Sequence, residues 1–206
     1  MYKYIIGIDE VGRGALAGPV VVAAVAATTK FRIQSARRQT KLKIPLRDSK
    51  KLSANQREVW FAFIKKQKIP YAIARVSPKI IDKINISNTA NLAATSALWA
   101  LIKNYKLRIK NCRVYLDGGL YINSKFKNKN LKNIKTQTII RGDEKIPAIS
   151  LASIIAKVSR DRYMKNLHKK YPRYDFIHNV GYGTKKHVRA IKKRGLSPIH
   201  RRTFKI

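Results

Sequence analysis

The sequence predicts a single α/β domain with a helical C-terminal portion. Three observations support this class: short β-branched and aromatic segments typical of strands, longer segments with helical caps or spacing, and the absence of repeats or a linker. We expect one domain over residues 1–206, in which residues from about 160 to 206 form the helical portion.

Five short segments, rich in β-branched and aromatic residues, predict strands. The first ends at Asp9-Glu10, and a turn rich in glycine separates it from the second, which predicts a hairpin. The last two end at Asp117 and just before Gly142-Asp143. The predicted strands cover residues 2–8, 20–26, 71–76, 113–116 and 137–140.

Capping residues and apolar spacing predict the helices. Ser53 has capping-box spacing to Gln56, and the apolar residues at 151, 154, 155 and 158 follow the i, i+3, i+4, i+7 pattern. Residues 30–43 show no clear period, which predicts a loop. The predicted helices run from Ser53 to about Gln67, from Asn88 to about Asn104, from Pro147 to Lys170 and from Thr184 to Gly195.

The charge balance is extreme: 46 lysines and arginines stand against 10 acidic residues, a net charge of +36. Such a chain attracts polyanions, chiefly nucleic acid, and binds them in a salt-dependent way. The alternative is a lysine bias imposed by AT-rich base composition, which would account for the magnitude without explaining any site.

The cellular location follows from cysteine usage and hydropathy. The single cysteine, Cys112, excludes an intramolecular disulfide and a cysteine-based zinc site, so a reducing cytoplasm is expected. The N-terminus lacks the apolar region of a signal peptide, and no apolar run approaches the roughly 20 residues of a spanning helix. We therefore expect a soluble cytoplasmic protein that does not associate with a membrane. We also expect it to act as a monomer.

Acidic residues at the ends of predicted strands are the most informative feature. Asp9, Glu10, Asp117 and Asp143 can converge at one edge of the sheet, where α/β folds place their ligand sites. Carboxylates crowded together repel, so such a cluster needs a cation, and Mg²⁺ or Mn²⁺ suits hard oxygen ligands. The alternative is that these are ordinary turn acids. Because adjacent strand residues face opposite ways, Asp9 and Glu10 can share a site only if the strand bends there.

The glycine turn after the first strand contains Gly12, Arg13 and Gly14. It fits neither a dinucleotide-binding fingerprint nor a P-loop, because Ala17 stands at the third glycine position and no Gly-Lys-Ser/Thr follows. A backbone without Cβ atoms could approach a sugar closely. From spacing alone, that reading and a purely structural tight turn are equally supported.

Six blocks, in order along the chain, resemble bacterial ribonuclease HII, the type 2 ribonuclease H. They are Gly7-Ile8-Asp9-Glu10-Val11-Gly12-Arg13-Gly14 with Ala17-Gly18-Pro19-Val20, Asp48-Ser49-Lys50-Lys51-Leu52-Ser53, Asp117-Gly118, the segment from Ala152 to Met164, Gly181-Tyr182-Gly183-Thr184, and Ser197-Pro198-Ile199-His200-Arg201-Arg202. One block would be weak, whereas six in order are specific.

The resemblance implies a ribonuclease H-like fold, a mixed β-sheet flanked by helices. It also implies an endonuclease dependent on Mg²⁺ or Mn²⁺, with two ions per active site. Such enzymes cut the RNA strand of RNA–DNA hybrids and incise 5′ of ribonucleotides embedded in duplex DNA, leaving 3′-hydroxyl and 5′-phosphate ends. Residues from about 160 to 206 would then bind the substrate.

Carried over by position, the resemblance assigns catalytic and metal-binding roles to Asp9, Glu10, Asp117 and Asp143. The turn of Gly12, Arg13 and Gly14 would read the ribose 2′-hydroxyl, the group that distinguishes RNA from DNA. Tyr182 would pack on the neighbouring sugar, and Lys50 would lie near phosphate. Without the motifs, an ordinary loop aromatic and a solvated lysine would be the simpler readings of these two residues.

The sequence departs from the family pattern at several positions. Gly119 stands where asparagine is frequent, Glu144 adds a charge beside Asp143, and Asn179-Val180 replace a frequent His-Lys. None removes a proposed ligand. Asp161 is the rival fourth acid, but it lies within a predicted helix, where pairing with a neighbouring lysine or arginine is expected. The related ribonuclease HIII has an extra N-terminal domain, for which the residues before Asp9 leave no room.

Two other classes of function remain open from the sequence. A basic RNA-binding protein of ribosomal type would explain the charge, but it gives no reason for acids at strand ends. Another nuclease, or a resolvase on the same fold, would cut all-DNA substrates.

Overall fold

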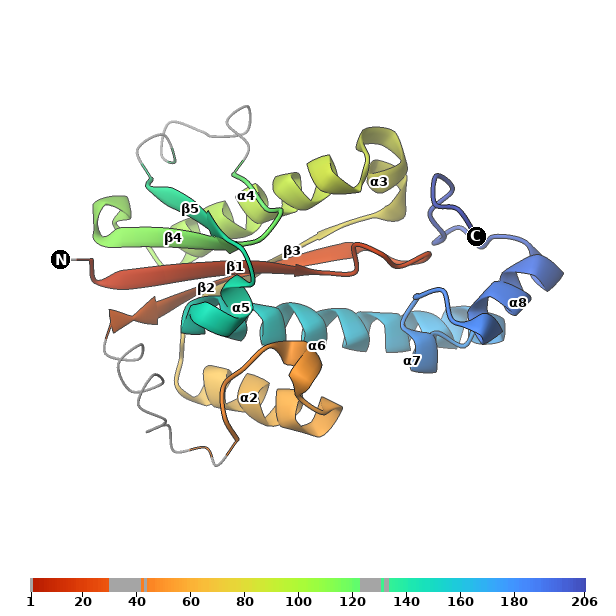
Figure 1. The fold of residues 1–206 in the computed structure, drawn as a ribbon, viewed down its shortest axis with the longest axis horizontal. Helices are drawn as coiled ribbons and strands as arrows, with labels where there is room; N and C mark the ends of the chain where they lie inside the picture. The colour runs from red at the N-terminus through yellow and green to blue at the C-terminus, as the bar shows by residue number, and fades with distance from the viewer. Residues whose placement is uncertain (1, 30–41, 43, 123–130, 132–133) are drawn as a thin grey trace.

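The computed structural model describes residues 2–29, 42, 44–122, 131 and 134–206. Within this part a five-stranded sheet has the order β3-β2-β1-β4-β5. Figure 1 shows the sheet between two helical layers, with the C-terminal helices projecting beyond one end. The strands are β1 Tyr4–Val11, β2 Val20–Thr28, β3 Tyr71–Val76, β4 Cys112–Asp117 and β5 Thr136–Ile139.

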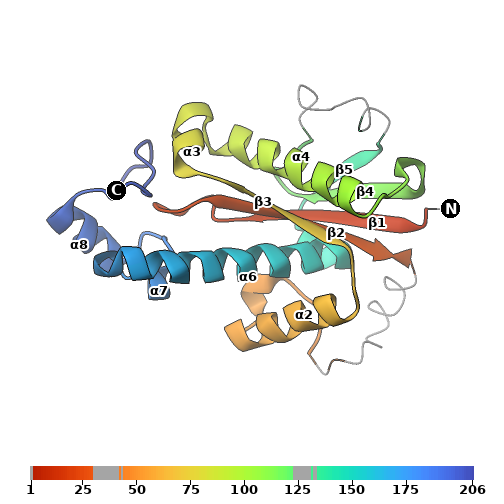
Figure 2. The ribbon, with the colours of Figure 1, turned by 180° about the vertical axis from the view of Figure 1, so that it is seen from behind.

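The helices divide between the two faces of the sheet. α4 covers one face, and α6 covers the other with α2 packed outside it, as the two opposite views show (Figures 1 and 2). The α-helices are α2 Ala54–Lys66, α3 Pro78–Ile84, α4 Ile86–Asn104, α5 Gly142–Lys145, α6 Pro147–Lys170, α7 Phe176–Asn179 and α8 Lys185–Arg194. The 3₁₀ helices are η1 Ser49–Lys51, η2 Ile109–Asn111 and η5 Pro172–Tyr174.

The central strand β1 determines where the sheet opens. It pairs antiparallel with β2 along its whole length, up to Val11 opposite Val21. It pairs parallel with β4 only as far as Ile8 opposite Leu116. The carboxyl ends of β1 and β4 therefore lie side by side at one end of the sheet. The predicted mixed sheet flanked by helices, with a helical C-terminal portion, is confirmed.

Two apolar cores stabilise the layers. Ile6 and Ile8 of β1 are buried on the α4 side together with Ala93 and Leu98 of that helix. Small and β-branched residues of β2 pack on the other side against α6 and against Trp60 of α2. β2 is buried along nearly all of its length because helices cover both faces, which explains why its sequence is continuously apolar.

Gly7 brings β1 unusually close to the start of α6. A Cβ atom at this position would lie 2.1 Å from the carbonyl carbon and 2.3 Å from the carbonyl oxygen of Ala148. Backbone atoms cannot move aside as a flexible side chain can, so Gly7→Ala is expected to destabilise the protein by about 3 kcal/mol. Urea denaturation would measure the loss. Gly14→Ala is the control, because no atom of the described residues lies within 4 Å of its added Cβ atom; equal losses would contradict the prediction.

Most predicted elements are confirmed, with corrections at their ends. β1 does not end before Asp9-Glu10 but continues through both residues to Val11. The cap of α4 is Asn85, whose side chain accepts from the N–H of Asn88, so the predicted cap at Asn88 is wrong by three residues. The short helices α3, α5 and α7 were not predicted. The predicted loop at 30–43 lies outside the described residues except at residue 42.

Caps and breakers explain the confirmed boundaries of α2 and α8. Ser53 and Gln56 form the reciprocal capping box that starts α2. Thr184 accepts from the N–H of His187 at the start of α8, and Gly195 follows its last residue with φ +75°. Within the described residues, no helix is both long enough and apolar enough to cross a membrane.

Two buried histidines hold the C-terminal segment against α8. His187 Nδ1 lies 2.8 Å from the carbonyl oxygen of Tyr182, which can only accept, so this nitrogen donates. His187 Nε2 then accepts from His200 Nε2 at 3.0 Å, and His200 Nδ1 accepts from the N–H of Ser197. Every contact is satisfied only while both rings are neutral. Burial lowers the pKa of both histidines, and it is the main cause that brings His200 to about 4.

This histidine pair predicts a loss of stability in acid. A folded-state pKa below the unfolded value means that the unfolded chain binds the proton first, so stability falls as the pH drops from about 6.5 towards 4. The contribution of His200 over this window is on the order of 3 kcal/mol. Unfolding measured at several pH values should show a flatter acid slope for His200→Gln than for the wild type. Identical slopes for wild type and His200→Gln would refute the prediction.

Candidate active site

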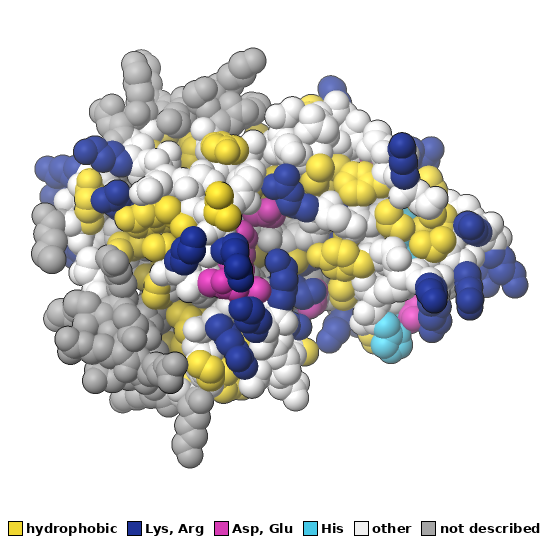
Figure 3. All heavy atoms as spheres, in the orientation of Figure 1, with side chains coloured by type: hydrophobic (Ala, Val, Ile, Leu, Met, Phe, Trp, Pro, Cys, Tyr) yellow, Lys and Arg dark blue, Asp and Glu magenta, His cyan; other side chains and the backbone are white. Residues whose placement is uncertain are grey.

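A cavity of about 350 Å³ opens at the carboxyl ends of β1 and β4. Its lining includes all four acids that the sequence singled out, Asp9, Glu10, Asp117 and Asp143. In Figure 3 acidic side chains gather near the centre of one face and are surrounded by lysine and arginine side chains. The cavity therefore combines a negative floor with a positive rim, an arrangement suited to a polyanion that must approach a cation.

Asp9 and Glu10 reach the same cavity from opposite faces of β1. Asp9 lies on the face of Gly7, towards α6, whereas Glu10 lies on the other face. Both line the cavity because pairing of β1 with β4 stops one residue earlier, at Ile8. The two acids share the cavity although both remain within the strand.

Asp9 is the most buried of the four acids, with 5% of its surface exposed. Burial, then the charges of Glu10 and Asp117, hold its pKa well above the ordinary value. Hydrogen bonds from Ser153 and from the N–H of Glu10 act in the opposite direction without overcoming them. An ionised Asp9 is therefore strained electrostatically unless a positive charge is added nearby.

Glu10 is held by one oxygen and leaves the other unpaired. Arg13 Nη1 donates to Oε1 at 3.3 Å. Oε2 is buried and has no hydrogen-bond partner within the described part of the chain. Burial raises the pKa of Glu10, although Arg13 lowers it. A buried carboxylate oxygen without a partner is a costly arrangement that a bound cation would relieve.

Asp117 and Asp143 meet across the ends of β4 and β5. Asp117 Oδ1 accepts from the N–H of Gly142 at 2.7 Å, which ties β4 to the start of α5. Asp143, 8% exposed, lies in α5. Its pKa is raised to about 6 by burial and by the charges of Asp48 and Asp117. The acid after β5 is therefore placed by a helical turn and not by the strand end itself.

Asp48 is a fifth carboxylate that the sequence reasoning did not place in the site. It is 8% exposed, interacts with Asp143 by charge and a hydrogen bond, and accepts from the N–H of Lys50 at 2.9 Å. The signal that could have found it was its position at the head of the Asp48-Ser49-Lys50 block. With Asp117, Asp143 and Lys50 it lines a second, contiguous cavity of about 580 Å³.

The donor set fits a divalent cation, although the side chains do not form a closed cluster. Among the described residues, no three acidic, histidine or cysteine side chains are grouped tightly enough to form a ready metal cage. The acids instead surround shared space, with raised pKa values on three of them and one orphaned oxygen. Carboxylate oxygens around a space that admits water are the ligands Mg²⁺ and Mn²⁺ accept.

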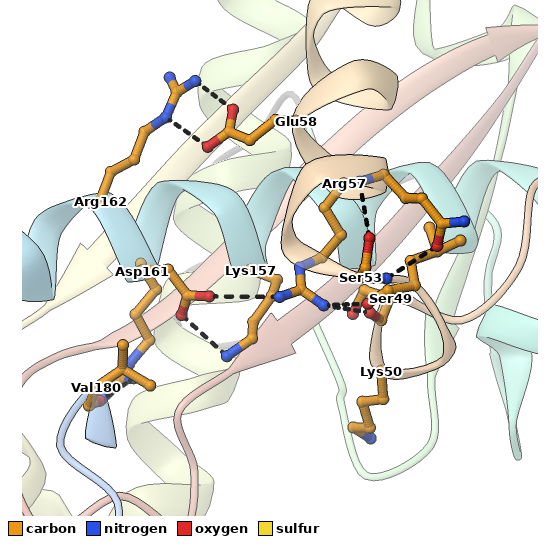
Figure 4. Close-up of polar contacts among 12 residues, drawn as sticks. Ser49, Lys50, Ser53, Arg57, Glu58, Lys157, Asp161, Arg162 and Val180 are labelled. Atoms are coloured by element: carbon orange, nitrogen blue, oxygen red, sulfur yellow. Dashed lines mark hydrogen bonds and ion pairs between the residues drawn. The ribbon is translucent and has the colours of Figure 1, made fainter. Parts of the chain in front are cut away.

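Lys50 lines the cavity together with the acids. Figure 4 shows it on the short segment that Arg57 contacts. Burial alone would lower its pKa, but the charges of Asp48, Asp9, Asp143 and Asp117 raise it overall. Its 3₁₀ helix η1 is held from behind by an arginine of α2. Arg57 donates to the carbonyl oxygens of Ser49 at 2.9 Å and of Leu52 at 2.5 Å.

The same close-up explains Asp161, the rival acid (Figure 4). It accepts from Lys157 at 2.9 Å and lies 3.9 Å from Arg57. Asp161 does not line the acidic cavity. The predicted helix pairing is confirmed, and Asp161 joins α6 to α2.

The remaining predicted substrate residues are Gly12, Arg13, Gly14 and Tyr182, and the first three are not among the residues that line the cavity. Tyr182 lines it, with Arg160 and Lys157 placed 5.4 Å and 5.8 Å from its ring centroid. The side chain of Arg13 crosses from Glu10 to the carbonyl oxygen of Gly119 and to Ser87 of α4. The Gly12–Gly14 turn thus follows directly on the acids of β1.

A mixed five-stranded sheet with acids at the carboxyl ends of its central strands defines a protein of the ribonuclease H-like class. A family model described as Ribonuclease HII matches residues 6–206. The chain belongs to the ribonuclease HII family. It is a ribonuclease H, a hydrolase that acts on the RNA strand of RNA–DNA hybrids.

Relatives and solved structures agree with this assignment. Ribonuclease HII of Pelagibacter ubique is 44% identical over 202 residues, covering 98% of this chain and 96% of that protein. The enzyme of Caldicellulosiruptor bescii is 43% identical, covering 98% and 87%. The structure of ribonuclease H2 from Pyrococcus horikoshii has a TM-score of 0.71 and 28% identity, covering 98% of this chain and 94% of that one.

Two further structures carry ligands or partners of their own. The ribonuclease HII of Archaeoglobus fulgidus, solved in complex with PCNA, has a TM-score of 0.71 and 27% identity, with 98% and 96% coverage. Bst ribonuclease HIII, solved in complex with Mn²⁺, has a TM-score of 0.66 and 20% identity, covering 93% of this chain and 63% of that chain, and supports the fold alone.

Proposed function

We propose that this ribonuclease H also incises 5′ of single ribonucleotides embedded in duplex DNA, leaving 3′-hydroxyl and 5′-phosphate ends. The observation that carries the proposal is the single cavity lined by Asp9, Glu10, Asp117 and Asp143, next to a glycine turn. An enzyme that cut only RNA–DNA hybrids would not need a structure that recognises one isolated ribose. A turn whose backbone can approach one sugar is such a structure.

We propose that Asp9, Glu10, Asp117 and Asp143 are the catalytic carboxylates and hold two divalent cations, Mg²⁺ or Mn²⁺. When bound, such ions supply an activated water and stabilise the departing 3′ oxygen. The carboxylates give the cavity a negative lining that attracts cations, and the raised pKa values of Asp9, Glu10 and Asp143 support this assignment.

The remaining residues orient the nucleic acid. The Gly12–Gly14 turn is proposed to contact the ribose 2′-hydroxyl, and Tyr182 to pack on the neighbouring sugar. Lys50, held beside the acids by η1, is proposed to neutralise a phosphate next to the scissile bond. Residues from about 160 to 206 are proposed to extend this grip within a single domain, since α8 carries Lys192, Lys193 and Arg194 in its last turn.

A cleavage assay with three duplexes tests the proposal: all-DNA, RNA–DNA hybrid, and DNA with one embedded ribonucleotide. With Mg²⁺ or Mn²⁺ we expect cleavage of the last two, a cut on the 5′ side of the single ribonucleotide, and no product with EDTA. Cleavage of the hybrid alone would overturn the incision activity. Cleavage of all-DNA duplex would favour a nuclease or resolvase of different specificity, and binding without any cleavage would favour a basic RNA-binding protein.

A further inference from the structure

Two arginines of this very basic chain point inward. Arg160 of α6 is fully buried, and Arg201 of the C-terminal segment is 1% exposed. Among the described residues, no carboxylate lies within ion-pair distance of either guanidinium group. A buried cation without an anion is unfavourable unless its N–H groups are fully used. Their acceptors therefore reveal what these two residues hold in place.

All but one of the acceptors are main-chain carbonyl oxygens of residues 12–19, the connection between β1 and β2 that contains the Gly12–Gly14 turn. Arg201 donates through Nη2 to Gly12 at 2.6 Å and through Nη1 to Arg13 at 2.7 Å. Its Nε and Nη2 both donate to Gly18 at 3.1 Å. One planar guanidinium thus joins Gly12 and Arg13, at the start of the connection, to Gly18 near its end. These acceptors lie 183 to 189 positions earlier in the chain than Arg201.

Arg160, which lies in α6, donates to further carbonyl groups beside those that Arg201 holds. It donates through Nη2 to Ala17 and through Nε to Pro19, both at 3.0 Å, and through Nη1 to Val180 at 2.7 Å. The two arginines thereby direct carbonyl oxygens of the β1–β2 connection into the protein, those of Gly12, Arg13, Ala17, Gly18 and Pro19. Arg160 also contacts the ring of Tyr182, so replacing it would disturb a second predicted substrate residue. Arg201 does not lie within cation–π distance of that ring, so a substitution at Arg201 tests the turn more directly.

Fixing these carbonyl oxygens also fixes the opposite N–H groups. In a planar trans peptide the C=O and the following N–H point in opposite directions. Arg201 holds the carbonyls of Gly12 and Arg13, so the N–H groups of Arg13 and Gly14 are turned away from it. Within the described residues neither N–H has an acceptor. Gly14 is exposed, and no atom in the described ranges lies within 4 Å of the position its Cβ would take.

We propose that Arg201 is a positioning residue for ribose recognition: it locks the Gly12–Gly14 turn so that two main-chain N–H donors face the substrate sugar. This inference rests on the proposed function of the turn. A hydroxyl oxygen accepts such donors, whereas the C2′ hydrogens of deoxyribose cannot. Arg201 acts through the turn and does not touch the substrate, and the C-terminal segment thereby determines sugar specificity at a site formed by the N-terminal hairpin.

The neighbouring residue provides a matched control. Arg202 carries the same charge but is exposed, and within the described part of the chain it is anchored by its main-chain N–H alone, which donates to Asp82 Oδ2 at 3.0 Å. Arg202→Gln removes one positive charge from the same segment and leaves the turn untouched. Arg201→Lys keeps the charge but lacks the planar fork needed to reach three carbonyl groups at once.

The test compares cleavage of two DNA duplexes carrying at one position either a ribonucleotide or its 2′-fluoro analogue, a much weaker acceptor. For Arg201→Lys we expect kcat on the ribonucleotide duplex to fall by about 30-fold, with KM within about twofold, because misplacement near the reacting bond acts on kcat. The ratio of ribonucleotide to 2′-fluoro cleavage should fall by about tenfold. Arg202→Gln should retain the wild-type ratio.

A ratio measurement separates positioning from folding, because a smaller folded fraction lowers both rates equally. Asp82→Asn is a second test. Asp82 of α3 accepts hydrogen bonds from the main-chain N–H groups of Arg202 and Thr203, so weakening this anchor should also lower the ratio, by a smaller factor. An unchanged ratio in Arg201→Lys would overturn the inference while leaving the proposed function intact. Failure of the wild type to cut the ribonucleotide duplex would instead overturn the proposed function.

Discussion

Asp9→Asn is expected to lower cleavage of a single-ribonucleotide duplex by about 10³-fold or more, within the range for removing one electrostatic group from an active site. Asp9 is the most buried of the four acids and is surrounded by Ser153, Glu10 and Asp117. Asparagine keeps the shape and one oxygen but removes the charge that would hold a cation. Single-turnover cleavage with saturating Mg²⁺ or Mn²⁺ measures the effect.

Binding should respond in the opposite direction. Removing a negative charge from the cavity reduces repulsion of phosphate, so the affinity of Asp9→Asn for the duplex should be retained or increased. Thermal stability should also be retained, because burial raises the pKa of Asp9 and its charge does not favour the fold. Asp175→Asn is the matched control, since Asp175 pairs with His178 and Lys186 away from the cavity. Normal turnover by Asp9→Asn would exclude Asp9 from the mechanism.

Gly12→Ala is the second large expected effect, a loss of about 10²-fold in cleavage together with about 3 kcal/mol of stability. Gly12 has φ +90°, and an added Cβ would lie 2.3 Å from Nε and 2.9 Å from Cδ of Arg160. Arg160 is buried and donates hydrogen bonds to three carbonyl groups, so its side chain cannot move aside without breaking the bonds that hold the turn. The turn must therefore shift beside Glu10 and the acids of β1.

Gly195→Ala separates the conformational effect from the clash. Gly195 also has a positive φ, +75°, but among the described residues nothing lies within 4 Å of an added Cβ, and it is the C-terminal cap of α8. We expect it to lose about 1 kcal/mol in urea denaturation and to keep its cleavage rate. If Gly12→Ala matched Gly195→Ala in both measurements, the close contact with Arg160 would have no functional consequence.

Local patterns predicted the elements that depend on neighbouring residues. The capping box of Ser53 and Gln56 and the apolar spacing within α6 are properties of short segments, and the structure confirms both. Asn85 and Asn88 show the limit of such reasoning. Either could cap a helix, and the preceding α3, which was not predicted, places Asn85 at the cap position.

The acids were selected from the sequence, but their arrangement was not. Strand ends suggested that Asp9, Glu10, Asp117 and Asp143 converge, and all four line one cavity. The expected bend between Asp9 and Glu10 was unnecessary, because the open end of the β1–β4 pair lets both faces of the strand reach the cavity. Asp48 joins this group from a separate segment, and its place beside Asp143 depends on tertiary packing.

The sequence by itself determined the family, the main helices and strands, and the small set of carboxylates from which a site could be built. Only the tertiary structure decided that Asp48 faces Asp143 and that Arg160 and Arg201, among 46 basic residues, turn inward to hold a glycine turn. The physical reason is distance along the chain. Capping and amphipathic spacing act over a few residues, whereas the bonds from Arg201 to Gly12 and Arg13 form only when the C-terminal segment packs against the first hairpin.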